Sequence, residues 1–216
     1  MFAKAEEREE PGRGPDTLPT MDRSSLRLGI DLDGVVADFN AGWTALHNAE
    51  FGGALTPDLV TSWNDLHTVA GFDEMNAFWE WARPNPVRRS VFRHLDLLPQ
   101  ALDTLRMLDD AGHRIVIITT KPDWAIQDTL HWLADNMIPT REVHLTDTKH
   151  EVDCDVYLDD SPVVLPGLVA HRPHATTCRF VRPWNAPLEG AHDIGSWPEF
   201  HALVTERTPQ LRPACE

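Results

Sequence analysis

Short apolar runs alternate with amphipathic segments along most of this chain, and this alternation constrains the fold more than any other sequence feature. We predict strands at 28–30, 114–118, 142–146, 156–158 and 176–181. Apolar residues at helical spacing predict helices at 37–48, 99–110, 123–136, 162–170 and 196–205. Strands that alternate with helices over short links form a parallel sheet with helices on both faces. We therefore expect an α/β fold with a doubly wound parallel sheet.

One stretch interrupts this alternation. From Phe51 to about Arg93, Gly and Pro residues separate short amphipathic pieces that carry several large aromatic residues. Such an aromatic cluster is typical of a small core, and a ligand surface is the alternative. We predict a small helical cap at 41–93, inserted after the first strand into a core formed by 25–40 and 94–208.

The two ends of the chain differ from its body. Residues 1–24 are charged and rich in Pro and Gly, which predicts a disordered extension, with Met21 as an alternative start. This segment has no apolar centre of the kind that a signal peptide requires. We expect 209–216 to form a flexible tail.

Polar residues directly follow four of the predicted strands. In strand order they are Asp31 and Asp33, then Thr119, Thr120 and Lys121, then Lys149, and finally Asp159 and Asp160. Parallel sheets bind ligands beyond the carboxyl ends of their strands. Taken singly, Thr119 and Asp160 could be helix caps and Lys149 a solvated surface residue. Their recurrence at four strand ends favours a shared functional site.

The first of these groups has a specific chemical meaning. Side chains alternate along a strand, so Asp31 and Asp33 start on the same side. Two carboxylates so close together repel each other unless a cation or a shared proton lies between them. The pair is thus suited to metal-assisted phosphoryl chemistry, and an ordinary Asp-Gly turn before Gly34 is the alternative.

The composition of the chain limits the kinds of molecule that it is expected to bind. A formal charge of -15 disfavours a nucleic-acid polymer, whose phosphates would be repelled, but it allows a small phosphorylated substrate that needs one local positive site. No apolar run approaches the roughly 20 residues of a membrane helix, so we expect no membrane association. The three cysteines show no metal-binding spacing and are typical of reduced thiols in a cytoplasmic protein.

Together, the four groups resemble the signatures of the haloacid dehalogenase (HAD) superfamily of phosphohydrolases. The residues are the Asp31-Leu32-Asp33-Gly34-Val35 motif, Thr119, Lys149 and the Asp159-Asp160 pair. Further stretches resemble the 5'(3')-deoxyribonucleotidases within it: Asp33 to Phe39, Leu97-Leu98-Pro99, Trp132-Leu133, Leu145-Thr146 and Tyr157 to Ser161. The resemblance implies a Rossmann-like sheet with a cap, and an enzyme that removes phosphate from nucleoside monophosphates.

The resemblance also implies a role for each site residue. Asp31 would be the nucleophile that forms an aspartyl-phosphate, and Asp33 the general acid and base. Mg²⁺ would bind Asp31, the backbone carbonyl of Asp33, and Asp159 or Asp160. The remaining roles are phosphate binding by Lys149 and Thr119, further phosphate contacts from Thr120 and Lys121, and contact with the base by Phe39, for which packing under the cap is the alternative.

The sequence departs from the nucleotidase pattern at two positions near the expected phosphate site, and several other functions are alternatives to the nucleotidase assignment. Asp147 stands where mammalian relatives are expected to carry a basic residue, and Lys121 directly follows the threonine pair. The alternatives are a HAD phosphatase for a sugar phosphate or another small metabolite, a catalytically silent phosphate-binding protein, and a polynucleotide end-phosphatase. The aromatic residues of the cap would suit a homodimer.

Overall fold

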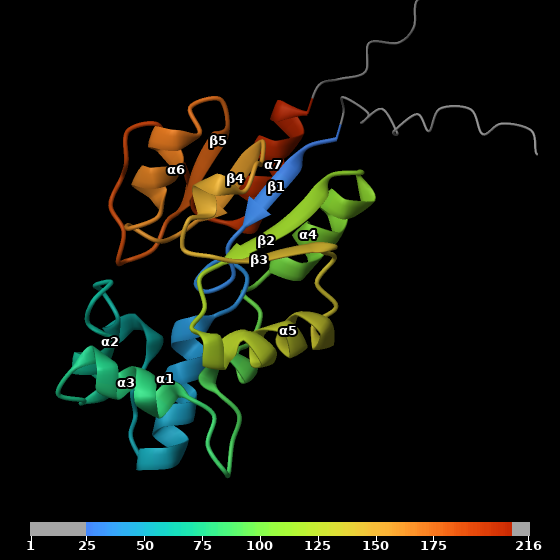
Figure 1. The fold of residues 1–216 in the computed structure, drawn as a ribbon. Coiled ribbons are helices and arrows are strands. Elements are labelled where there is room, and N and C mark those ends of the chain that lie inside the picture. The colour runs from blue at the N-terminus through green and yellow to red at the C-terminus, as the bar shows by residue number, and fades with distance from the viewer. Residues whose placement is uncertain (1–24, 209–216) are drawn as a thin grey trace, which may run out of the picture.

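The computed structural model describes residues 25–208, so the expectations for 1–24, Met21 and 209–216 lie outside the described residues. At its centre is a six-stranded sheet with the strand order β3-β2-β1-β4-β5-β6. All neighbouring strands pair in parallel. Helices lie on both sides of the sheet (Figure 1). The expected doubly wound α/β fold is confirmed.

The strands and helices have the following bounds. The strands are β1 (Arg27–Ile30), β2 (Arg114–Thr119), β3 (Glu142–Leu145), β4 (Val156–Asp159), β5 (Thr176–Phe180) and β6 (Ala191–Ile194). The α-helices are α1 (Phe39–Phe51), α2 (Leu66–Ala70), α3 (Met75–Ala82), α4 (Ala101–Asp110), α5 (Ile126–Asp135), α6 (Leu165–His171) and α7 (Trp197–Arg207). Short 3-10 helices occupy Pro57–Leu59 (η1), Val91–Arg93 (η2), Asp123–Ala125 (η3) and Lys149–Glu151 (η4).

The two faces of the sheet carry hydrophobic cores of unequal size. Alternate residues of β1 and β2, such as Ile30 and Ile117, belong to the larger core together with side chains of α4 and α7. The intervening residues, such as Val116, pack with Tyr157 and with Leu168 of α6 in a much smaller core. Burial on both faces explains why β2 is a nearly continuous apolar run.

The register places the ends of the central strands together. Ile30, the last residue of β1, pairs with Ile117 of β2 on one side and Leu158 of β4 on the other. The backbone N–H of Asp31 continues this ladder by donating to the carbonyl of Leu158 at 3.0 Å. Residues that follow β1, β2 and β4 therefore share one edge of the sheet.

Some elements differ from the sequence-based expectation. Helix α1 begins at Phe39 and not at residue 37, because the Asp38 carboxylate caps it by accepting from the backbone N–H of Ala41. Strand β6 was not expected. Of its residues Ala-His-Asp-Ile only Ile194 is buried, and an edge strand of this kind needs backbone pairing with β5 more than an apolar pattern.

The segment that interrupts the alternation packs around aromatic side chains. Trp43 of α1 meets Phe78 of α3 edge to face, with ring centroids 5.3 Å apart, and Phe78 also contacts Trp79 and Trp81. Because α1 is continuous across residues 40 and 41, the expected division at that point falls within its first turn. The assignment of 41–93 as a separate cap stays a prediction. None of the helices between residues 25 and 208 is long and apolar enough to cross a membrane.

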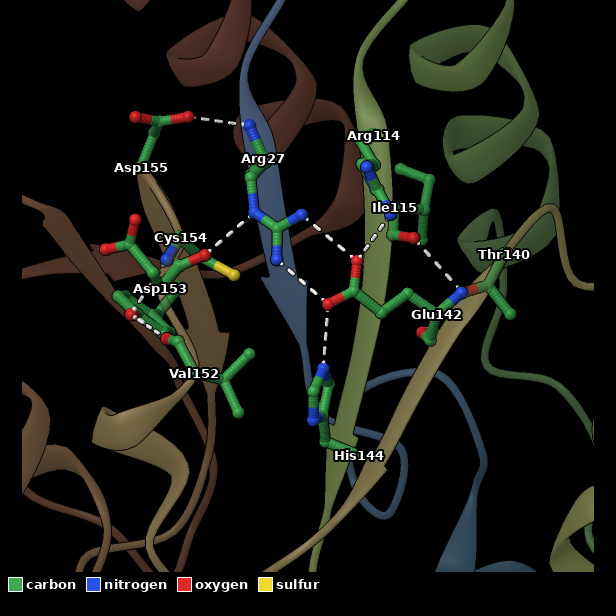
Figure 2. A network of polar contacts seen from close by, with 11 residues as sticks. Arg27, Arg114, Ile115, Thr140, Glu142, His144, Val152, Asp153, Cys154 and Asp155 are labelled. Carbon is green, nitrogen blue, oxygen red and sulfur yellow. Dashed lines mark hydrogen bonds and ion pairs between the residues drawn. The ribbon is translucent and has the colours of Figure 1, made fainter. Parts of the chain in front are cut away.

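The opposite, amino-terminal edge of the sheet has its own polar network (Figure 2). Glu142 starts β3 and accepts two hydrogen bonds from Arg27, at the start of β1, at 2.9 and 3.0 Å. It also pairs with Arg114 at 2.8 Å and with His144 at 2.8 Å. The hydrogen bonds from Arg27, followed by that from His144, lower the pKa of Glu142 to about 2. This network ties the starts of three strands together.

Candidate active site

A buried lysine links two carboxylates at the carboxyl edge of the sheet. The ammonium nitrogen of Lys149 in η4 lies 2.9 Å from Asp31 and 2.7 Å from Asp159. Only 4 % of the Lys149 residue surface is exposed. Burial acts to lower the pKa of Lys149, but the attraction of Asp159 and Asp31 outweighs burial and raises it. Lys149 therefore stays charged and neutralises part of the site.

Three carboxylates converge beside this lysine. Oxygen atoms of Asp31, Asp159 and Asp160 all lie within 4.8 Å of one another, and the three residues are buried. Burial, with a contribution from Asp31, raises the pKa of Asp159 to about 6 despite the opposing charge of Lys149. Burial and then the neighbouring charges of Asp31 and Asp159 raise the pKa of Asp160 well above its ordinary value. The protein alone thus leaves excess negative charge in this cluster.

The oxygen atoms of the Asp159-Asp160 pair have different surroundings. In Asp159, Oδ1 accepts from the backbone N–H of Ser161 at 2.8 Å and Oδ2 accepts from Lys149. In Asp160, Oδ2 accepts from the indole N–H of Trp184 at 3.0 Å. Its Oδ1 is buried and has no hydrogen-bond partner among residues 25–208. A hard divalent cation such as Mg²⁺, which prefers carboxylate oxygens, fits this set of donors.

Asp33 lies beside a second buried lysine. The side chain of Lys121 is 1 % exposed, and its ammonium group contacts Oδ2 of Asp33. The other oxygen, Oδ1, is buried without a partner in the described part of the chain. Burial raises the pKa of Asp33 and lowers that of Lys121, while their mutual attraction opposes both shifts. A raised pKa favours the protonated form of a carboxyl group, which is the form that can donate a proton.

Lys121 also joins Asp33 to an aromatic stack. Its ammonium nitrogen lies 3.9 Å from the centroid of the Phe92 ring, within the range of a cation–π interaction. Phe92 stacks on Phe39 at a centroid distance of 5.6 Å and on Trp79 at 6.4 Å. Phe39, the expected base-contacting residue, is therefore one layer of this stack.

The two threonines lie at the end of β2. Thr119 is the last residue of the strand and is buried, and its carbonyl accepts from the backbone N–H of Thr146 at 3.0 Å. The hydroxyl of Thr120 donates to the carbonyl of Thr146 at 3.0 Å, which ties this loop to the loop that carries Lys149. Their expected phosphate contacts stay predictions.

Sequence reasoning missed the loop after β5. Arg182, Trp184 and Asn185 all reach residues of the site, through Gly34 and Asp160. The rule that functional residues follow the strands would have found them, because this loop begins directly after the predicted strand at 176–181.

The sequence of this chain is similar to those of known nucleotidases. A family model described as "5' nucleotidase, deoxy (Pyrimidine), cytosolic type C protein" matches residues 24–209. A Chlorobaculum tepidum protein named "Putative 5'(3')-deoxyribonucleotidase" is 30% identical over 155 residues, which cover 66% of this chain and 73% of the relative. The mitochondrial 5'(3')-deoxyribonucleotidase of Mus musculus is 24% identical over 157 residues, covering 64% and 66%.

Solved structures support the fold. A HAD family hydrolase from Deinococcus radiodurans R1, solved with bound phosphate and sodium, matches with a TM-score of 0.57. The match covers 86% of this chain and 97% of that protein at 16% sequence identity. At this identity the likeness establishes a shared fold, the HAD-like sheet with its flanking helices.

Proposed function

The chain belongs to the 5' nucleotidase, deoxy (pyrimidine), cytosolic type C protein family, and from this premise we propose that it is a 5'(3')-deoxyribonucleotidase that removes phosphate from nucleoside monophosphates. Family and fold together make it a phosphatase of the 5'-nucleotidase type. The proposed details are the Mg²⁺ requirement, the aspartyl-phosphate intermediate and the deoxynucleotide preference. The observation that supports the metal and the intermediate is the convergence of Asp31, Lys149, Asp159 and Asp160 at one edge of the sheet. The deoxynucleotide preference is proposed from the family and its named relatives alone.

In the proposed mechanism Asp31 is the nucleophile. One of its carboxylate oxygens forms a bond to phosphorus while the bond from phosphorus to the ester oxygen of the substrate breaks. The product is an aspartyl-phosphate and a free hydroxyl on the leaving nucleoside. Lys149, which contacts Asp31 at 2.9 Å, would hold the nucleophile and balance charge on the transferring phosphoryl group.

Asp33 would transfer the protons in both halves of the reaction. Protonated at the start, it donates to the ester oxygen as that oxygen leaves, and its raised pKa supports this state. As a carboxylate it then accepts a proton from the water that attacks phosphorus. That attack breaks the bond between phosphorus and Asp31, releases inorganic phosphate and regenerates both side chains.

The proposed metal site would use Asp31, the backbone carbonyl of Asp33, and Asp160. The choice of Asp160 over Asp159 rests on its unpartnered Oδ1, because both oxygens of Asp159 already accept hydrogen bonds. When bound, Mg²⁺ would supply positive charge that offsets the carboxylates and the substrate phosphate. The raised pKa values of Asp159 and Asp160 support the need for such a charge.

The aromatic stack supports a substrate with a planar group. The ring centroids of Phe39, Phe92 and Trp79 lie within 6.4 Å of one another, and Lys121 connects Phe92 to Asp33. A nucleobase presents a flat face that can pack on such side chains whatever its identity. We propose Phe39 as the base contact and Thr119 and Thr120 as helpers in phosphate binding. Homodimer formation and a cytoplasmic location also stay proposals.

The test is phosphate release from deoxy- and ribonucleoside monophosphates and common sugar phosphates, with Mg²⁺ and with EDTA. We expect Mg²⁺-dependent release that is strongest on deoxynucleotides. Strongest release from a sugar phosphate would reject the nucleotidase assignment but keep the phosphatase chemistry. Release that EDTA does not diminish would reject the metal.

The nucleophile is tested separately with Asp31→Asn, which has nearly the same shape but lacks the reactive carboxylate. We expect turnover to be abolished while the circular dichroism spectrum stays that of the unaltered protein. Substantial residual activity would reject Asp31 as the nucleophile.

A further inference from the structure

The loop between β5 and β6 contacts the last aspartate of the site, Asp160, at two points. The indole N–H of Trp184 donates to Oδ2 of Asp160 at 3.0 Å. The side-chain amide of Asn185 donates to the backbone carbonyl of Asp160 at 2.7 Å and to that of Phe180 at 2.9 Å. Asp160 is thus restrained at both its backbone and its side chain.

The same loop reaches the turn that follows the nucleophile strand. Arg182 donates through Nε to the carbonyl of Gly34 at 2.7 Å and lies over the Phe180 ring at 4.2 Å. Gly34 has a φ of +74°, and a Cβ atom there would lie 2.1 Å from Oδ2 of Asp160 and 3.3 Å from Trp184. The Gly34 turn, Asp160 and Trp184 are therefore packed with no room for a further side-chain atom.

These contacts make the two oxygens of Asp160 unequal. Oδ2 accepts the hydrogen bond from the indole N–H of Trp184, which fixes its position. Oδ1 is buried, in a residue that is 2 % exposed, and has no partner between residues 25 and 208. An unpaired buried carboxylate oxygen is unfavourable, and Asp160 contributes an oxygen to a cluster with Asp31 and Asp159 whose atoms lie within 4.8 Å of one another, so a cation bound there would supply the missing partner.

We propose that Trp184 is a positioning residue for the divalent cation: it holds Oδ2 of Asp160 so that Oδ1 is presented as the direct ligand. Asn185 and Arg182 hold the backbone of Asp160 and of the Gly34 turn in the matching position. The inference rests on the cation site of the proposed function, and it concerns cation affinity and not the identity of the substrate. Residues that orient metal ligands typically change metal affinity by 10–100-fold when replaced.

The test measures cation binding without substrate. Trp184→Phe removes the N–H and keeps an aromatic ring, and Mg²⁺ binding is followed by calorimetry, with Mn²⁺ binding followed by electron paramagnetic resonance as a second probe. We expect the Kd for both ions to rise about 10-fold. Trp63→Phe, at an exposed indole outside the site, is the matched control and should leave Kd unchanged.

The outcomes separate orientation from simple packing. A Kd within twofold of the unaltered protein, at an unchanged melting temperature without metal, would overturn the proposal. Trp184→His keeps a ring N–H and should recover part of the affinity, whereas equal losses in Trp184→His and Trp184→Phe would also count against it. If the unaltered protein binds Mg²⁺ but hydrolyses no nucleotide, the proposed function fails and this inference stands. If it binds neither ion, both fail.

Discussion

Lys121 is a costly residue to bury, and its position suggests what it contributes. Its ammonium group is shared between Oδ2 of Asp33 and the face of Phe92. In the proposed mechanism this arrangement would fix one oxygen of Asp33 and leave Oδ1, which has no partner in the described part of the chain, to carry the proton. We infer that the side chain supports the proposed proton transfer; the phosphate contact predicted for it from the sequence stays a prediction.

Lys121→Met removes the contact that orients Asp33, so proton donation should weaken selectively even though loss of the ammonium charge raises the pKa of Asp33 further. We expect kcat/KM for a deoxynucleoside monophosphate to fall about 10- to 100-fold, within the range that general acid–base catalysis supplies. For p-nitrophenyl phosphate we expect a fall of less than about threefold, because its leaving group departs without a proton. Parallel assays on the two substrates check this. Equal losses on both would instead assign Lys121 to phosphate binding, and Lys121→Arg is the control that keeps the charge.

Among the larger elements, the starts of β1, β2 and β3 depend on one carboxylate. Glu142 bonds Arg27, Arg114 and His144, and its pKa is lowered to about 2. A folded-state pKa below the ordinary 4.5 stabilises the protein above pH 4.5, and this stabilisation is lost as pH falls toward 2. The side chain is 22% exposed, so solvent screening limits the effect.

Glu142→Gln should therefore lower the free energy of unfolding by about 1 kcal/mol at pH 7, a value at the upper end for exposed ion pairs. The difference from the unaltered protein should shrink between pH 4.5 and pH 2. Urea unfolding across this pH range measures it. The control is Glu80→Gln, whose partner Arg83 is itself exposed and which should cost less than about 0.5 kcal/mol. If the difference in unfolding free energy between Glu142→Gln and the unaltered protein grew at low pH, the proposed stabilisation by ionised Glu142 would be wrong.

The same elements show what local pattern can predict. Buried strands such as β2 can be predicted from the sequence because both of their faces pack against apolar side chains. Once the strands are predicted, their last residues indicate where Asp31, Thr119 and Asp159 lie. Strand β6 was not predicted because a strand at the edge of the sheet does not need apolar residues on both faces. The hydrogen bond from Arg182 to Gly34 was not predicted either, because it joins residues 148 positions apart and no local pattern encodes that contact.

At the scale of the whole molecule, the negative charge at the candidate active site links cation binding to the stability of the fold. The chain carries a formal charge of -15, and three of its buried carboxylates face one another. A cation that binds only the folded state stabilises it by mass action, by about 2.7 kcal/mol at a hundredfold excess over Kd.

Mg²⁺ at that excess should raise the melting temperature by about 5–10 °C relative to EDTA, for a protein of this size. Differential scanning calorimetry measures this shift. Sodium chloride at equal ionic strength controls for general screening of the net charge. Asp160→Asn should remove most of the shift, and a shift that survives in that variant would place the cation elsewhere.

The small core beneath α6 has a consequence for the motions of the protein. Few apolar side chains secure that face, and local opening is easiest where buried apolar contact is least. Helix α6 packs on η4, the short helix that begins with Lys149. A transient departure of α6 would therefore loosen Lys149 from Asp31, its partner in the proposed mechanism, without unfolding the molecule. The rate of amide hydrogen exchange in α6 and η4 would then report the fraction of molecules in which α6 is detached.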